Sequence, residues 1–454
     1  MSSGSMGYGK GKRHWPALIA SLLLLSMIPI AIPQARASGL TPHAPIAING
    51  DSGFTAANGV TGGKGTPSDP YIIQGWNITA SSCCGPGPGI SINSTHAHFT
   101  INNVYVSDYT IDIPSVRLTN VANGAIKDSD IRGYRLTTAI ISSRNVVISN
   151  ARSFLRMSIA LSDGITIAND GIYRIEVSSS THITMINNRF DGLPGCDLCV
   201  SNSSRVVISG NNFSGCDCIS VSIGRSDHIQ VLHNIIRGDS PLRVGESSFV
   251  GIFDNQIESF YDTLIDLSSC SSVSVQRNQI RGNIGSSSNT MMRVNACERV
   301  DITRNIFAPP NPYHGSFDIL TVTQSKNIAI TANDLSNSTT AMNISDSSNM
   351  LIDENSIQSN AQGVVLNRST NIQVFHNNFL HNTAQARDAG STNSVWDNGY
   401  PSGGNYWSDY AGVDICRGPG QNICPHPDGI GDTPYAFNYN QDNFPLMQPV
   451  MIAV

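Results

Sequence analysis

Acidic and basic side chains recur at similar positions of successive sequence repeats between residues 239 and 293. Asp239, Asp262 and Asp266 supply carboxylates, and Arg243 and Arg293 supply guanidinium groups. Two carboxylates about 5 Å apart suit a retaining glycosidase, and a separation of roughly 6.5–9.5 Å suits an inverting one. These five residues are therefore candidate catalytic groups of a polysaccharide lyase or glycoside hydrolase.

The same residues have a simpler interpretation, which we favour over catalysis. Arg243, Asp266 and Arg293 fall on successive repeats, so opposite charges alternate along the outer surface. A solvated ladder of this kind avoids like charges on neighbouring strands, and each exposed ion pair adds little stability.

Two long repeats beside this ladder indicate ligand binding. The extra residues fall at 281–291 and 308–317, in the same phase of the repeat. Insertions on one face of a repeat protein often build its binding surface, and nearby aromatic rings can stack on sugars. The predicted set that binds a polysaccharide or surface glycan is Tyr261, Tyr313, His314, Arg243, Asp266 and Arg293.

A second group of carboxylates lies near the C-terminus. Asp428-Gly-Ile-Gly-Asp432 resembles the end of a calcium loop, because it has oxygens at short spacing and glycines for the turn. Asp414 or Asp409 would have to supply the upstream ligand. The alternative is a turn whose carboxylates accept backbone N–H groups.

Ten cysteines in a chain with an export signal predict disulfides. Cys416 and Cys424 bracket a Gly/Pro-rich loop, so we expect them to pair. Four cysteines of two consecutive repeats fit either bridges between coils or a zinc or copper site; they are Cys196, Cys199, Cys216 and Cys218. Cys270 and Cys297 hold equivalent inward positions, where parallel side-chain directions disfavour a bridge. The sequence assigns no role to Cys83 and Cys84.

The elements that position these residues come from one repeated phrase, such as HITMINNRF or RVVISGNNF. Each copy carries an asparagine, and the steps between successive asparagines run from 21 to 28 residues. A fixed period in this range predicts a solenoid. The asparagines are Asn188, Asn211, Asn234, Asn255, Asn278, Asn305, Asn333, Asn355 and Asn377.

Apolar residues in each repeat alternate with polar ones, which is typical of short strands with one buried face. About 22 residues per coil and three strands per coil predict a parallel β-helix, in which equivalent strands stack ~4.8 Å apart. An inward asparagine at one bend then bonds the coils on either side. A small residue, Ser or Cys, occupies the position eight before each asparagine and predicts a tight interior turn.

Residues 1–37 have the parts of a secretory signal peptide, which are a basic stretch, an apolar run at 17–32 and a small-x-small motif at 35–37. An uncleaved membrane anchor is the alternative. Without the four basic residues of this segment, the mature chain has 23 basic and 33 acidic residues, a net charge of −10. The acidic balance and the lack of a basic tract exclude a nucleic-acid role. No second apolar span follows, so we expect no transmembrane segment in the mature chain.

The two ends of the chain are less regular, and each must cap an open end of the solenoid. We expect an N-terminal cap with irregular coils at 38–97, the β-helix at 98–390 and an aromatic, Gly/Asp-rich C-terminal cap at 391–454.

Three motifs carry a family resemblance: FTAANGVTGGKGTPSDPYII at 54–73, GGNYWSDY at 403–410 and DGIGDTPY at 428–435. Together with the NNF-type repeats, they resemble the NosD-like right-handed β-helix proteins, also described as carbohydrate-binding and sugar-hydrolase repeats. The resemblance implies an all-β, right-handed parallel β-helix on the cell surface. It also implies copper as a candidate cofactor, because one member is an accessory protein of nitrous-oxide reductase.

Copper would need His, Met or Cys side chains together, whereas His376 and His381 are expected at the surface, across a bend from each other. The Asp-Pro-His-Glu signature of alginate epimerases with this architecture is absent, as is a clustered Asp-Asp pair like that of polygalacturonases. We therefore expect an exported protein, extracellular, on the cell surface or periplasmic in a diderm host. It binds carbohydrate or forms part of the cell surface without catalysis. A polysaccharide lyase or hydrolase and a copper-handling accessory protein are the alternatives.

Overall fold

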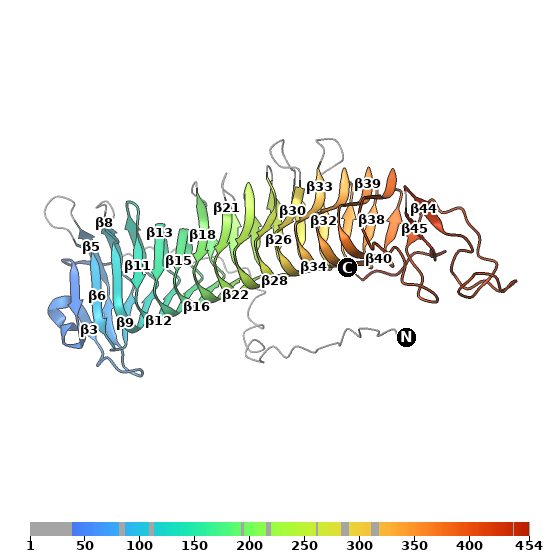
Figure 1. Cartoon of the computed structure of the whole chain (residues 1–454). Coiled ribbons are helices and arrows are strands. Elements are labelled where there is room, and N and C mark those ends of the chain that lie inside the picture. The colour runs from blue at the N-terminus through green and yellow to red at the C-terminus, as the bar shows by residue number, and fades with distance from the viewer. Residues whose placement is uncertain are drawn as a thin grey trace, which may run out of the picture. The chain divides into compact units, whose positions relative to one another are not determined.

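The computed structural model describes residues 39–80, 87–108, 113–191, 195–214, 219–259, 262–282, 290–309, 317–438 and 440–453. These residues belong to one compact unit, 35–454. Its strands stack coil upon coil in parallel register (Figure 1), with almost no helix. The expected signal peptide at 1–37 lies outside the described residues.

Each regular coil contributes one strand to each of three tracks. The first track is β15 (Gly171–Ser178), β18 (Cys196–Ser201), β21 (Ile219–Gly224), β24 (Ser240–Gly245), β27 (Ile265–Ser268), β30 (Thr290–Asn295), β33 (Asp318–Thr323), β36 (Thr340–Ser345), β39 (Gln362–Asn367) and β42 (Ala384–Ala389). The second track is β16 (Thr181–Ile186), β19 (Ser204–Ser209), β22 (Asp227–Leu232), β25 (Ser248–Phe253), β28 (Ser271–Gln276), β31 (Glu298–Thr303), β34 (Lys326–Thr331), β37 (Ser348–Asp353) and β40 (Thr370–Phe375). The third track is β17 (Arg189–Phe190), β20 (Asn212–Ser214), β23 (Ile235–Arg237), β26 (Gln256–Ser259), β29 (Gln279–Gly282), β32 (Ile306–Ala308), β35 (Asp334–Ser336), β38 (Ser356–Gln358), β41 (Asn378–Leu380) and β43 (Tyr406–Trp407).

The N-terminal coils follow the same parallel pairing with less regular strands, and β2 already stacks on β6. They are β1 (Thr41–Pro42), β2 (Ile46–Asn49), β3 (Val60–Gly62), β4 (Tyr71–Gln74), β5 (Trp76–Ala80), β6 (Ile90–Thr95), β7 (Phe99–Asn102), β8 (Tyr105–Asp108), β9 (Val116–Lys127), β10 (Asp130–Gly133), β11 (Thr138–Ile141), β12 (Arg144–Ser149), β13 (Arg152–Ala160) and β14 (Asp163–Ala168). Two short 3-10 helices, η2 (Asp51–Gly53) and η3 (Ala56–Asn58), precede the antiparallel pair β3–β4.

The alternation of side chains along each strand produces the core. In β21, for example, Val221 and Ile223 are buried, whereas Ser222 and Gly224 point outward and are half-buried. The predicted parallel β-helix, with three short strands per coil, is confirmed.

The row of inward asparagines is a continuous hydrogen-bonded file. Asn211 Nδ2 donates to Asn234 Oδ1 (3.1 Å) and to the carbonyl of Met185 (3.0 Å), and the backbone N–H of Asn211 also donates to Asn234 Oδ1 (2.8 Å). Asn234 repeats the pattern with Asn255 (3.0 Å). These buried amides are thus satisfied by one another and by backbone carbonyls, as the spacing predicts.

An aspartate ends the file on each side. Asn188 Oδ1 accepts the backbone N–H of Asp170 (3.0 Å), and Asp170 in turn accepts that of Ala151 (2.6 Å). At the other end, the backbone N–H of Asn405 and the indole N–H of Trp407 donate to Asp442 Oδ2, at 2.7 and 2.8 Å. Burial raises the pKa of Asp170 to about 8 and that of Asp442 to about 7.

The small residues of the second bend form a parallel row. The backbone N–H of Ser180 donates to Ser203 Oγ (3.2 Å), whose hydroxyl donates to the carbonyl of Ser201 (2.7 Å). Cys270 and Cys297 occupy this row as buried free thiols, with the N–H of Cys270 donating to Cys297 Sγ (3.3 Å).

Aromatic rings close the C-terminal end of the core. The ring of Trp407 stacks on Phe379 at 4.2 Å and on Tyr435 at 4.3 Å, between ring centroids. Tyr435 belongs to β44 (Tyr435–Phe437), which forms an antiparallel pair with β45 (Asn440–Asp442).

Candidate functional site

The predicted charge ladder lies on the outer face of the first track. The parallel register aligns Arg243 of β24 with Asp266 of β27, and Asp266 with Arg293 of β30. Arg293 Nη1 lies 3.5 Å from Asp266 Oδ2. The spacing of the sequence repeat therefore predicted correctly that these three residues are neighbours.

Asp262 belongs to the same group. Its Oδ2 accepts a hydrogen bond from the Ser240 hydroxyl (2.6 Å) and lies 3.2 Å from Arg243 Nη2. Its Oδ1 accepts the backbone N–H of Thr263 (2.7 Å). Asp239 lies one coil earlier, where its carbonyl accepts the Ser259 hydroxyl (2.8 Å).

The third track adds charges that the sequence reasoning missed. Arg237 Nε lies 2.7 Å from Glu258 Oε2, and Arg281 follows Glu258 in register. Glu258 and Asp266 thus lie in register between Arg237 and Arg243 of the coil before and Arg281 and Arg293 of the coil after. This arrangement is the alternating ladder that the simpler interpretation predicts, in which each arginine offsets a carboxylate of the next coil.

An open pocket of about 380 Å³ lies beside the ladder, on the outer face of β18, β21, β24 and β27. Gly224 and Gly245 form its floor. Along the strands, Arg243 stands at one side, and the corner ion pair of Arg225 and Glu246, with Nε and Oε2 3.0 Å apart, stands at the other. The hydrogen bond that Arg225 donates to Glu246 raises the pKa of Arg225, so this guanidinium is charged at all working pH values.

The two floor glycines are not required by the backbone. Neither has a positive φ. A Cβ at Gly224 would meet no atom within 4 Å, and a Cβ at Gly245 would make only ordinary contact with Ser268 Oγ at 3.4 Å. Other coils carry a side chain at this outward position, namely Ser201, Ser268, Asn295, Thr323, Ser345 and Asn367. The glycines therefore create the hollow, and their adjacency in an otherwise substituted row was the sequence signal that we overlooked.

The three aromatic binding candidates, Tyr261, Tyr313 and His314, lie outside the described residues. Their contribution to a binding surface stays a prediction.

The C-terminal carboxylates bind backbone amides. Asp432 accepts the N–H groups of Ile415 (3.0 Å) and Cys416 (3.1 Å), and Asp414 accepts those of Asp428 (3.0 Å) and Gly429 (2.8 Å). Asp428 Oδ1 accepts the N–H of Ile430 (3.2 Å). Asp409, the alternative ligand, accepts hydrogen bonds from Gln385 Nε2 (2.9 Å) and the Tyr435 hydroxyl (3.1 Å).

This geometry matches the turn that we weighed against a calcium loop. Within the described ranges, no three His, Cys, Asp or Glu side chains form a group that could hold a metal ion.

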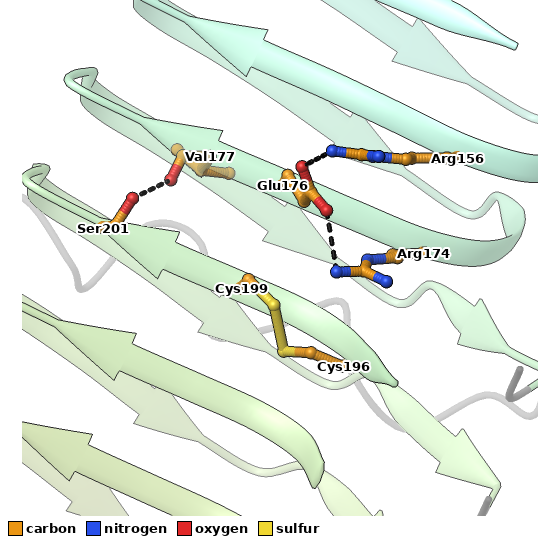
Figure 2. Close-up of a disulfide and its surroundings, with 7 residues drawn as sticks. All are labelled: Arg156, Arg174, Glu176, Val177, Cys196, Cys199 and Ser201. Atoms are coloured by element: carbon orange, nitrogen blue, oxygen red, sulfur yellow. Dashed lines mark hydrogen bonds and ion pairs between the residues drawn. A yellow bond between two sulfur atoms is a disulfide. The ribbon is translucent and has the colours of Figure 1, made fainter. Parts of the chain in front are cut away.

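Two disulfides are present among the described cysteines. Cys416 and Cys424 pair as expected, with their Cα atoms 4.3 Å apart. Cys196 pairs with Cys199 of the same strand, β18 (Figure 2), so the expected bridge between coils is wrong for these two residues. Their Cα atoms lie 6.0 Å apart. Cys216, Cys218, Cys83 and Cys84 lie outside the described residues.

A small charged cluster surrounds this disulfide. Glu176, the register partner of Cys199, accepts hydrogen bonds or ion pairs from Arg156 and Arg174 (Figure 2). Burial raises the pKa of the neighbouring Asp197 to about 7, against the opposing effect of Arg174.

His376 is held in a surface network. Its Nδ1 lies 3.3 Å from Asp353 Oδ1, its Nε2 lies 3.1 Å from the Ser402 hydroxyl, and Asp353 raises the pKa of His376. None of the helices in the described part of the chain has the length and apolar character needed to cross a membrane.

Comparison with known proteins gives two family matches. Residues 315–412 match the family described as periplasmic copper-binding protein (NosD), and residues 115–280 and 170–308 match the right-handed β-helix region. No curated protein sequence matches the chain.

Several solved structures are similar in fold. The periplasmic alginate epimerase AlgG is 12% identical, with 72% of this chain and 85% of that chain covered and a TM-score of 0.38. The A-module of the mannuronan C-5 epimerase AlgE6 from Azotobacter vinelandii is 14% identical, with 65% and 92% covered and a TM-score of 0.36. PfbA, a surface adhesin of Streptococcus pneumoniae, is 12% identical, with 70% and 85% covered and a TM-score of 0.37.

The stacked coils, the inward asparagine file and the two family matches lead to one classification. The chain is a right-handed parallel β-helix protein, and its residues 315–412 are similar to the NosD family.

Proposed function

We propose that this protein is exported and binds carbohydrate, without catalysis, in the pocket floored by Gly224 and Gly245. The observation that carries the proposal is the pair of adjacent glycines at an outward position that other coils fill with a side chain. Because neither the backbone nor a packing contact requires them, the hollow itself is what they provide.

The lining of the pocket suits a polyhydroxylated ligand. Ser201, Ser222 and Ser268 supply hydroxyls, and Asn202 supplies an amide. Hydroxyls and amides both donate and accept hydrogen bonds, as sugar hydroxyls do. The volume of about 380 Å³ falls within the range of small-ligand sites.

The charges at the rim favour binding over catalysis. Asp266 is paired with Arg293, and Asp262 with Arg243 and the Ser240 hydroxyl. A general acid for glycoside cleavage needs a carboxyl group that keeps its proton near neutral pH. Both carboxylates are instead engaged with arginine side chains, at 3.5 and 3.2 Å.

Filling the pocket is the sharpest test, because the fold tolerates a side chain there. We expect Gly224→Asn to fold as the wild type does, since its Cβ meets nothing and Asn295 already occupies the same row. A glycan array followed by titration calorimetry should show binding by the wild type and a loss of at least about tenfold in affinity for Gly224→Asn. Ser345→Asn, in the same row but away from the pocket, is the matched control and should bind normally.

Two other results would change the proposal. If Gly224→Asn binds every array glycan as the wild type does, the pocket is not the site. If the wild type releases reducing sugars or unsaturated products from a uronate polymer, and Asp262→Asn abolishes that release, the protein is a polysaccharide lyase or hydrolase acting through its Arg/Asp face.

Copper handling is the second candidate function, because residues 315–412 match the NosD family. His376 of that segment is engaged by Asp353 and Ser402. Elemental analysis of protein purified without chelator decides between the two, because a stoichiometric copper content would favour the second candidate. The family description as periplasmic and the basic-apolar segment at 1–37 support the proposed export.

A further inference from the structure

The outer face of the second track carries an aromatic feature that the pocket does not explain. Phe253 ends β25, and Gly251, two residues earlier, points to the same outer face. A Cβ at Gly251 would lie 2.3 Å from Cε2 and 2.6 Å from Cζ of the Phe253 ring. The ring therefore lies on the backbone of Gly251, which is buried although its position is an outward one.

The absence of a side chain at Gly251 makes room for the Phe253 ring. Gly251 has no positive φ, so its backbone would accept an ordinary residue. The other coils carry a side chain at the equivalent position, such as Thr184, Val207, Gln230, Ser274 and Asp301. Phe253 itself is half-buried, so part of the ring stays open to solvent.

A second ring lies four residues earlier, at the corner of the same coil. Phe249 is 49% exposed and has φ 53°, a left-handed conformation that bulky residues rarely adopt. The equivalent positions of other coils carry polar side chains, including His182, Arg205, Ser272 and Asn327. Phe249 stacks on His228 of the preceding coil, with ring centroids 4.9 Å apart. Phe249 is therefore an exposed aromatic ring at a corner where those coils carry polar side chains.

Neutral polar groups surround the Phe253 ring. Gln230 and Ser274 flank Gly251 in register, on the coils before and after. Gln276 flanks Phe253, and its Nε2 donates to the Ser274 hydroxyl (2.7 Å). The ring is thus an apolar surface bordered by amides and a hydroxyl.

We propose that Phe253, with Phe249 on the same strand, is a platform on which an uncharged sugar ring stacks. One face of a pyranose presents C–H groups, which pack on an aromatic ring, while its hydroxyls reach outward to hydrogen-bonding groups at the edge. Gln230, Gln276 and Ser274 stand where such hydroxyls would fall. A protein partner or a lipid surface fits less well, because two phenylalanines and Leu232 make a small apolar area bordered by polar groups.

The platform is independent of the pocket. The pocket opens on the first track, and Glu246, its wall residue on this coil, lies three residues before Phe249. Different residues form the two sites, so either can be removed without the other.

The test uses the mature protein and a panel of neutral gluco-, manno- and galacto-oligosaccharides, with titration calorimetry of the strongest binder. We expect Phe253→Leu to weaken binding by roughly tenfold and Phe253→Tyr to keep it, because tyrosine preserves the ring. Phe375→Leu is the matched control, since Phe375 ends β40 in the same row but has Gln373, not glycine, two residues earlier. It should bind as the wild type does.

Thermal unfolding of all three variants checks that each is folded. If Phe253→Leu is folded and binds the neutral sugar as tightly as the wild type, the proposal is wrong. It is also wrong if no neutral oligosaccharide binds. Gly224→Asn separates the two sites, because loss of binding in Phe253→Leu alone supports the platform and loss in Gly224→Asn alone supports only the pocket.

Discussion

The inner and outer rows of the same strands follow different rules. Inside, the asparagine file repeats one residue from Asn188 to Asn405, and every amide bonds the next. Outside, the equivalent positions change from coil to coil among polar, charged and apolar side chains, and a few of them are glycines. The inner rows hold the coils in register, whereas three glycines of the outer rows, Gly224, Gly245 and Gly251, form the candidate sites.

The comparison predicts its largest effect in the middle of the file. Asn255→Ala removes four hydrogen bonds, two donated by Asn255 Nδ2 to Val231 and Asn278 and two that its Oδ1 accepts from Asn234. Because the partners stay buried without replacement, we expect the free energy of unfolding to fall by about 4 kcal/mol. Chemical denaturation measures it. The outward neighbour, Gln256→Ala, should change stability by less than about 0.5 kcal/mol, and equal effects of the two variants would contradict the comparison.

The N-terminal end of the file predicts a smaller effect that depends on pH. Oδ2 of Asp170 is buried and has no hydrogen-bond partner among the described residues, and burial raises the pKa of Asp170 to about 8. A raised carboxyl pKa means that the folded state binds the proton more tightly than the unfolded chain, whose pKa is near 3.8. The contribution of Asp170 to the free energy of unfolding is fully present below about pH 4 and is lost as the pH rises through about 8.

Asp170→Asn should remove that loss, because an amide carries no charge and can donate as Asn188 does to Ile167. We expect the variant to exceed the wild type by at least about 2 kcal/mol at pH 9 and to approach it at pH 4, as measured by denaturant unfolding at each pH. A constant difference between the two proteins across this range would refute the explanation.

The C-terminal end sharpens the comparison because the same substitution there should act in the opposite direction. Both oxygens of Asp442 accept hydrogen bonds from N–H donors, those of Asn405, Trp407 and Phe444. Asp442→Asn places an amide N–H₂ group against at least one donor, so we expect a loss of about 1–3 kcal/mol at neutral pH. If Asp442→Asn stabilises the protein as Asp170→Asn does, the expected difference between the two ends of the asparagine file is wrong.

The outer ion pairs should give the smallest effect. Asp254 and Arg277 stand at adjacent corners with two contacts, of 2.7 and 2.8 Å. Both side chains are partly exposed, so we expect Arg277→Ala to lower the free energy of unfolding by less than about 1 kcal/mol, and by less still in high salt. A loss comparable to that of Asn255→Ala would show that the outer rows hold the register as well.

The inner rows were predictable because buried side chains must repeat once per coil to pack and to form hydrogen bonds. A buried amide needs hydrogen-bond partners, so the regular spacing of Asn211 and Asn234 predicts that they bond each other. The two aspartate ends were missed because the pattern changes there. Asp170 lies only 18 residues before Asn188, and Asp442 follows an irregular cap.

The outer rows were predictable only in part. The register brought Arg243, Asp266 and Arg293 together, since strand stacking alone decides which residues become neighbours. The pocket was missed because it consists of absent side chains, which no motif marks. The Cys196–Cys199 pair was missed because it joins two residues of one strand and does not follow from the stacking of coils.

The most direct test of the proposed function is a crystal structure of the mature protein with the strongest binder from the glycan array. We expect a sugar unit above Gly224 and Gly245, within hydrogen-bond distance of the serine hydroxyls and Arg243. A glycan bound only elsewhere on the protein, with the glycine-floored pocket holding none of it, would contradict the account.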